Sequence, residues 1–118
     1  VGNNITIGAL TTIHQFCSIG DYSFIGMSTS ITMDIPAYVK VAANPARVIG
    51  LNSVGMSRNN ISADSISLIK KAYKLVYRKG LKIDEAIKKS KKLNEGVDDP
   101  FLNIFIQSLE VSERGILR

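Results

Sequence analysis

The first 36 residues place an aliphatic side chain at every sixth position. These residues are Val1, Ile7, Ile13, Ile19, Ile25 and Ile31. A second set, small or aliphatic, stands two positions before each of them from Ile7 on; it consists of Ile5, Thr11, Cys17, Ser23 and Thr29, and Ile35 continues it. A period of six fits neither a helix nor an alternating strand, so it indicates a repeat architecture.

Short parallel strands joined by tight turns satisfy this period. One aliphatic side chain per hexad then points into a narrow prism, the small residue shares the interior, and a glycine after most aliphatic residues permits the turn. Three hexads make one coil, so we expect coils at residues 1–18 and 19–36 and a third begun by 37–42. The pattern predicts a left-handed parallel β-helix, an exception to the usual right-handed parallel crossover. A few buried strands of an ordinary sheet are the alternative.

After a last strand at 38–42 and a turn at 43–46, the chain leaves the prism, and its pattern becomes helical from Ser62. Ser62 is a suitable N-cap and Gly80 a suitable end for the first main helix. A second helix has an acidic first turn at 84–85 and ends near Gly96, and Asp99 followed by proline starts a third. The expected core faces are Ile66, Ile69, Tyr73, Val76 and Tyr77; Ile83, Ala86, Ile87 and Leu93; and Leu102, Phe105, Ile106 and Leu109.

The fold class is therefore mixed β and α, with two domains. Residues 1–53 form the last coils of the β-helix and its exit loop, and residues 54–118 form a small all-α domain with three main helices. We expect this chain to be the C-terminal part of a longer protein, or to receive its missing coils from another chain. The reason is that stacked repeats need about three units and closed ends, whereas Val1 opens in phase with the repeat.

Charge separates the two halves. Residues 1–53 have no net charge, whereas residues 54–118 carry 13 Lys and Arg against 8 Asp and Glu and account for the whole net charge of +5. The lysine doublets 70–71, 88–89 and 91–92 fall largely opposite the predicted core faces. They form either a solvated helical surface or a docking surface for an acidic partner. Nucleic acid is not favoured, since aromatic interleaving, helix-turn-helix and zinc patterns are missing from the sequence.

Composition excludes several further classes. A single cysteine cannot form an internal disulfide and gives no sign of secretion. Cys17 holds a small interior position, which favours a buried structural residue over a nucleophile. The sequence has no apolar run near the roughly 18 residues of a membrane span and no leader pattern. We predict a soluble, cytosolic protein with no integral membrane segment, no cofactor and no metal site.

Several runs together carry a resemblance to a known family. They are residues 8–17 (Gly-Ala-Leu-Thr-Thr-Ile-His-Gln-Phe-Cys), 34–39 (Asp-Ile-Pro-Ala-Tyr-Val), 43–46 (Ala-Asn-Pro-Ala), 50–52 (Gly-Leu-Asn), 72–78 (Ala-Tyr-Lys-Leu-Val-Tyr-Arg) and 114–118 (Arg-Gly-Ile-Leu-Arg). In register over the whole chain, they resemble the UDP-N-acetylglucosamine O-acyltransferases, which perform the first committed step of lipid A synthesis.

The resemblance implies a homotrimer with active sites between neighbouring subunits. It implies transfer of an (R)-3-hydroxyacyl group from acyl carrier protein to the 3-hydroxyl of UDP-N-acetylglucosamine. Acyl carrier protein is strongly acidic, which fits the basic helical half of this chain.

Four residues match the family's substrate-binding positions. His14 and Gln15 match a pair at the nucleotide-sugar cleft, and the hexad phase itself predicts that His14 faces out of the prism. Asn52 and Arg58 match positions that hold the uridine and the pyrophosphate, where the planar guanidinium can grip two oxygens. Asn52 is equally well explained as a turn residue that hydrogen-bonds its own backbone.

Three positions depart from the family pattern. Many relatives have an acidic residue at the position of Val54 and a second arginine at that of Asn59, so nucleotide contacts are expected to be weaker or rearranged. Met27 stands where some members have a glycine at the end of the acyl slot. A methionine there should fill the slot and select a shorter donor, unless it only packs the coil.

The general base is not expected within this chain. The family's base is another histidine on an earlier coil, which places it upstream of Val1 and leaves His14, the only histidine here, as a possible auxiliary. We therefore predict that these 118 residues alone are inactive. The alternatives are another hexapeptide acyl- or acetyltransferase, such as the later N-acyltransferase of the same pathway, and a non-catalytic trimerising module whose basic helices bind an acidic protein.

Overall fold

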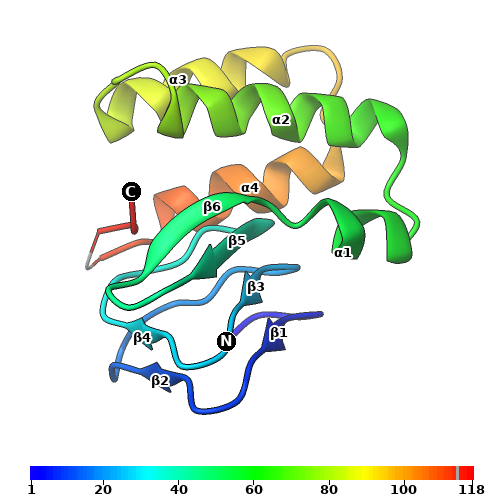
Figure 1. The fold of residues 1–118 in the computed structure, drawn as a ribbon. Helices are drawn as coiled ribbons and strands as arrows, with labels where there is room; N and C mark the ends of the chain where they lie inside the picture. Colours follow the sequence, from blue (N-terminus) through cyan, green and yellow to red (C-terminus); the bar gives the residue numbers. More distant parts are fainter. Residues whose placement is uncertain (114) are drawn as a thin grey trace.

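Coils and helices form two adjoining layers (Figure 1). The structure is a computed structural model that describes residues 1–113 and 115–118; Arg114, in the terminal run cited above, lies outside the described residues. The strands are β1 (Thr6–Ile7), β2 (Thr12–Ile13), β3 (Phe24–Ile25), β4 (Ser30–Ile31), β5 (Val39–Ala42) and β6 (Arg47–Leu51). The helices are α1 (Ser53–Arg58), α2 (Ala63–Tyr77), α3 (Ile83–Leu93) and α4 (Pro100–Glu110).

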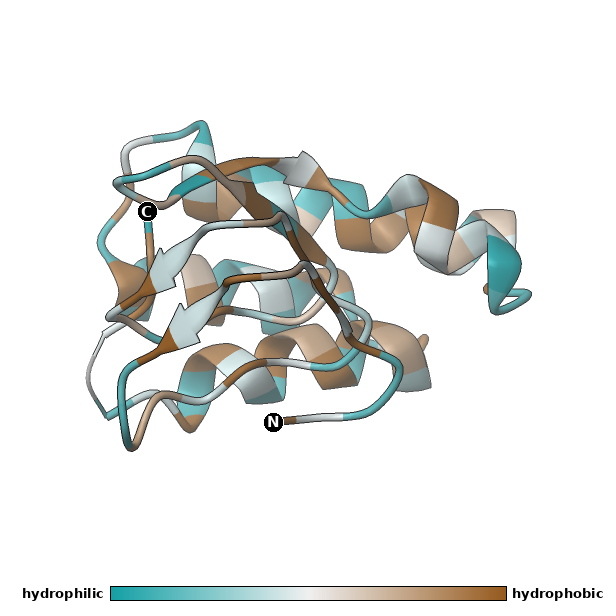
Figure 2. Ribbon diagram, turned by 60° about the horizontal axis from the view of Figure 1, so that its bottom comes forward, coloured by the Kyte–Doolittle hydropathy of each residue, from teal (hydrophilic) through white to brown (hydrophobic). Residues whose placement is uncertain are grey.

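The first two coils stack in the predicted register. β1 pairs in parallel with β3, β2 pairs in parallel with β4, and each residue lies beside the one 18 positions later, as in Ile7 beside Ile25. Hydrophobic positions recur from turn to turn along the coils (Figure 2). Ile25 and Ile31 of the second coil are at most 1% exposed, whereas Ile7 of the first is 42% exposed. The aliphatic row is therefore an interior row, buried more deeply where a further coil covers it.

The third coil begins two residues earlier than predicted. Ile19 is bridged in parallel to Ile35, and Phe24 pairs with Lys40, so both steps span 16 residues instead of 18. The predicted end of the second coil at residue 36 is thus wrong, and Ile35 continues the aliphatic row. The buried Asp34 lies at this shortened turn and holds it in place, because its carboxylate accepts hydrogen bonds from Ser18 N at 2.7 Å and from the Ser112 hydroxyl at 2.6 Å.

The stack ends where the chain reverses. β6 runs antiparallel to β5, with Val39 opposite Leu51 and Ala42 opposite Arg47. The sequence pattern predicts only an exit segment here, so β6 is a strand that the pattern does not reveal. Since β6 occupies the free edge of the four-stranded sheet β1-β3-β5-β6, that edge accepts no further parallel coil.

The three predicted main helices are confirmed, and two of them, α2 and α4, have a side-chain cap at their start. The Ser62 side chain accepts from Ser65 N, and the Asp99 carboxylate accepts from the amides of Phe101 and Leu102. Partial burial raises the pKa of Asp99, but hydrogen bonds from the Ser65 hydroxyl and from these two amides outweigh it and hold that pKa below its ordinary value. The short α1 was not predicted. No helix in the described part of the chain combines the length and apolar character that crossing a membrane requires.

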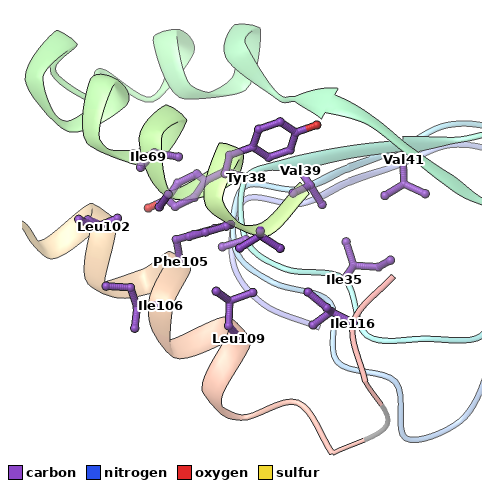
Figure 3. Packing of buried hydrophobic residues seen from close by; sticks show 14 of the residues in the cluster. Ile35, Tyr38, Val39, Val41, Ile69, Leu102, Phe105, Ile106, Leu109 and Ile116 are labelled. Carbon is purple, nitrogen blue, oxygen red and sulfur yellow. The ribbon is translucent and has the colours of Figure 1, made fainter. Parts of the chain in front are cut away.

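One buried cluster joins the coils to the helices. Figure 3 shows Tyr38 of the third coil among Ile69 of α2 and Leu102 and Phe105 of α4, and all four are fully buried. The predicted boundary between residues 53 and 54 falls within the first turn of α1. The coils and the helical segment therefore share a core, which fixes how they lie against each other.

A Gly20→Ala substitution should destabilise the coil stack. A Cβ at Gly20 would lie 2.7 Å from Ala37 Cα, and backbone of the next coil cannot move aside, so we expect a loss of about 1–3 kcal/mol in the free energy of unfolding. Gly26→Ala is the matched control, because its Cβ would meet first the Ala42 methyl at 3.3 Å. Thermal unfolding of the two variants measures the difference. Equal melting temperatures would contradict the close approach at Gly20.

Candidate functional site

A hollow of about 440 Å³ opens between the outer face of the four-stranded sheet and α1. Its lining residues are Asn4, Thr6, Phe24, Lys40, Leu51, Asn52, Ser53, Val54, Gly55, Arg58 and Asn59. The structure thus brings together Asn52 and Arg58, two of the predicted substrate-binding residues, with Val54 and Asn59, two of the three departures from the family pattern, beside them. The lining includes two cations and no carboxylate, so it favours an anionic ligand.

The sheet wall of this hollow is a ladder of outward-facing side chains. Thr6, Phe24 and Lys40 lie side by side on β1, β3 and β5, and the Lys40 ammonium stands 5.2 Å from the centre of the Phe24 ring. Phe24 and Lys40 were not among the site residues predicted from the sequence. A signal existed for Phe24, since the positions before the inward aliphatic residues are otherwise small and polar: Thr6, Thr12, Ser18 and Ser30.

Asn52 caps α1 and fixes it to the coils. Its side-chain oxygen accepts from Gly55 N at 3.1 Å, and its amide nitrogen donates to the Tyr22 carbonyl at 2.9 Å. Its backbone N–H donates to the Tyr38 carbonyl at 2.7 Å. The structural explanation of Asn52 is thus confirmed, and one amide hydrogen remains for a ligand. Because Arg58 is exposed in the last turn of the same helix, Asn52 also sets where that guanidinium stands.

His14 and Gln15 lie apart from this hollow. They follow β2, which belongs to the two-stranded sheet β2-β4 on another side of the prism. Both are exposed, which confirms that His14 faces outward. The His14 Nδ1 lies 3.0 Å from the Gln15 carbonyl oxygen. Since a carbonyl can only accept, Nδ1 is the donor in this contact.

Met27 occupies another corner of the coils. It follows β3 and is 70% exposed, so its side chain does not fill the prism. Gly8 lies directly against its backbone, because a Cβ on Gly8 would stand 2.7 Å from Met27 Cα. The predicted substrate-binding residues and Met27 therefore do not converge on one site within a single chain.

A second hollow, of about 690 Å³, lies on the other side of the segment that leads into α1. It is lined by Gly50, Leu51, Ser53, Lys70, Tyr73, Lys74, Arg78 and Lys79. Four of these residues are basic, and three of the four lie on α2 or at its C-cap. Leu51 and Ser53 line both hollows, so the two are neighbours across this segment.

Six-residue repeats stacked in parallel and closed by a helical segment define a hexapeptide-repeat protein of the acyltransferase type. The model of the family described as "Udp N-acetylglucosamine O-acyltransferase; Domain 2" matches residues 34–117, most of the chain. This chain belongs to that family, which separates it from the other hexapeptide transferases considered above.

Individual relatives agree with this assignment. The chain is 43% identical over 112 residues to the acyl-[acyl-carrier-protein]–UDP-N-acetylglucosamine O-acyltransferase of Ectopseudomonas mendocina, covering 95% of this chain and 43% of that protein. The crystal structure of UDP-N-acetylglucosamine O-acyltransferase from Moraxella catarrhalis is similar with a TM-score of 0.93 and 42% identity, over 100% of this chain and 45% of the other. The crystal structure of the enzyme from Bacteroides fragilis is similar with a TM-score of 0.91 and 31% identity, and the match covers 99% of this chain and 46% of the other. The chain thus spans somewhat less than half the length of these relatives, and it shares their left-handed parallel β-helix followed by a helical domain.

Gly55→Ala should loosen α1 although alanine is the better helix former. A Cβ at Gly55 would stand 2.8 Å from Asn52 Cγ and displace the capping side chain, which also donates to the Tyr22 carbonyl. Losing the cap and this hydrogen bond together costs about 2 kcal/mol, which exceeds the propensity gain of about 1 kcal/mol. Hydrogen exchange of the α1 amides should accelerate while exchange in β3 and β5 is unchanged. Ser57→Ala, at an exposed position of α1, is the control. Slower exchange in Gly55→Ala would show that the Asn52 cap does not hold the helix.

Proposed function

We propose that this chain is part of an enzyme that transfers an (R)-3-hydroxyacyl group from acyl carrier protein to the 3-hydroxyl of UDP-N-acetylglucosamine, the first step of lipid A synthesis. The observation that carries the proposal is the hollow with Arg58 and Lys40 and no carboxylate, in a chain that belongs to this acyltransferase family. A cytosolic location, predicted from the sequence, is part of the same proposal.

The nucleotide sugar is proposed to bind in the first hollow. Arg58 grips the pyrophosphate with two parallel N–H donors, and Asn52 offers its remaining amide hydrogen to the uridine. Val54 and Asn59 in the same lining bring no charge, so the anion depends on Arg58 and its neighbours on the sheet.

His14 and Gln15 are proposed to reach the nucleotide sugar across a subunit boundary. They lie on another side of the prism, so within one chain they cannot meet a ligand held by Arg58. A homotrimer satisfies this geometry, because a neighbouring copy brings its own outward corner to the cleft. Leu10 and Phe16, on turns of the first coil, are 85% and 83% exposed, as expected of side chains that a second copy covers.

Acyl carrier protein is proposed to dock on the second hollow. Lys70, Lys74 and Arg78 follow one another at four-residue spacing along α2, so they present three positive charges on one face to an acidic protein. The shared residues Leu51 and Ser53 place this surface next to the nucleotide site. The acyl donor on the carrier protein and the sugar that accepts the acyl group would therefore lie on either side of one short segment.

Transfer requires a base outside this chain. The sugar hydroxyl attacks the thioester carbonyl while a base takes the hydroxyl proton; the new C–O bond replaces the C–S bond, and the carrier leaves as a thiolate that receives this proton from the base. We propose that this base is a histidine upstream of Val1 and that His14 has an auxiliary role at the sugar.

Binding of UDP-N-acetylglucosamine tests the proposal. In the natural protein, calorimetric titration should detect binding, and Arg58→Ala should weaken it about ten- to hundredfold, the usual loss for a hydrogen bond to a charged group. Arg58→Lys should recover only part of the loss, since it keeps the charge without the planar fork. These 118 residues alone should show no turnover in an acyl-transfer assay.

Arg47→Ala is the matched control, because Arg47 is exposed on β6 and lines neither hollow. Absence of binding to the natural protein would favour the non-catalytic trimerising module. If Arg58→Ala leaves binding intact, the nucleotide binds at another site. Turnover by the 118 residues alone would contradict a catalytic base upstream of Val1.

Met27 is proposed to end the acyl slot. Met27→Gly in the natural protein should shift the preferred donor toward longer acyl chains, since each further CH₂ that becomes buried gains roughly 0.8 kcal/mol. Competition between donors of different length measures the preference. Met27→Leu keeps most of the side-chain volume and should not change it. An unchanged preference in Met27→Gly would leave Met27 as a surface residue without this role.

A further inference from the structure

Lys40 lies on the sheet wall of the first hollow, which is the proposed nucleotide site. The residues paired with it on the neighbouring strands leave its ammonium accessible. Along the four-stranded sheet its partner on one side is Phe24 and its partner on the other is Gly50. A Cβ built on Gly50 would have no neighbour within 4 Å. The neighbouring strand β6 therefore places no side chain at the position paired with Lys40.

Phe24 holds the lysine in place without neutralising it. The ammonium lies 5.2 Å from the ring centre, within range of a cation–π attraction. This contact restricts the flexible lysine side chain before any ligand arrives, so less rotamer entropy is lost on binding. A ring face also leaves the three N–H donors of the ammonium available to oxygen acceptors.

The positive charge of this hollow has no internal counterion. Among the described residues the one salt bridge joins Lys91 to Glu110, far along the chain from Lys40 and Arg58. Asn59, next to Arg58, donates its amide to the Gly55 carbonyl at 2.7 Å and adds no charge. The hollow thus contains one cation on α1 and one on the sheet, facing the same space from its two walls.

We propose that Lys40 binds the diphosphate of the nucleotide sugar together with Arg58, each cation serving from its own wall. This inference rests on the proposed function, since it assigns a further residue to the same anionic ligand. Arg58 binds as a planar fork and Lys40 as a compact point charge that can follow the phosphate oxygens. Specificity for the diphosphate then comes from two elements that only the folded third coil brings together.

Paired titrations of the natural protein with UDP and with uridine test this role. Lys40→Gln, which keeps a polar N–H donor on a side chain one atom shorter and removes the charge, should weaken UDP binding about three- to tenfold, as for an exposed charge-assisted contact, and leave uridine binding unchanged. Lys40→Arg should restore UDP affinity to near that of the natural protein. Lys88→Gln, an exposed lysine of α3 outside both hollows, controls for the loss of one positive charge.

The outcomes separate this inference from the function on which it rests. Unchanged UDP affinity in Lys40→Gln, with binding abolished in Arg58→Ala, would overturn the role of Lys40 and leave the nucleotide site in place. Equal losses for UDP and uridine, or the same loss in Lys88→Gln, would also overturn it, because the effect would not be specific to the diphosphate. If the natural protein that contains this chain binds neither UDP nor UDP-N-acetylglucosamine, both proposals are overturned.

Discussion

Tyr38 makes the contact on which the remaining structure depends. Its buried ring stacks on Tyr22 of the coil below with 5.5 Å between ring centres, and its hydroxyl donates to the Phe101 carbonyl of α4 at 2.7 Å. Its own carbonyl accepts from Asn52 N. Burial, reinforced by Tyr22 and by nearby carboxylates, raises the pKa of Tyr38, so the hydroxyl stays a neutral donor. One residue thus ties together two coils, the helical layer and the start of α1.

The first hollow, between the four-stranded sheet and α1, inherits its geometry from this contact. Tyr38 orients Asn52, Asn52 caps α1, and α1 ends at Arg58, so the helical wall of the hollow is set from within the core. Lys40 follows Tyr38 by two residues on the same strand segment and forms the other wall. A shift of the third coil would therefore move both cations at once, which keeps their spacing constant.

Local signals explain which parts of the fold could be predicted. The helices α2 and α4 have caps and periodic faces within their own sequence, and the hexads determine the first two coils by a short-range rule. Ile35 was misplaced because Asp34 is held by Ser112, 78 residues away, and no local pattern records that bond. β6 and α1 were missed for the same reason, since one needs β5 as a partner and the other needs Tyr22 and Tyr38. Lys40 has no sequence signal because the hollow exists only once three coils and the linker are assembled.

The separation of the predicted site residues has a physical cause in the prism itself. A three-sided coil presents its turns at corners that point away from one another, so residues after β2 and residues after β3 cannot face a common ligand in one chain. A single chain extends only one face of the prism, the four-stranded sheet, by adding β6 and then α1. Both hollows lie beside this extension. In the proposed function, the remaining catalytic groups would therefore come from a neighbouring prism. The linker at Leu51 and Ser53, which both hollows share, is the element that would bring an acidic carrier and a nucleotide sugar into reach of each other.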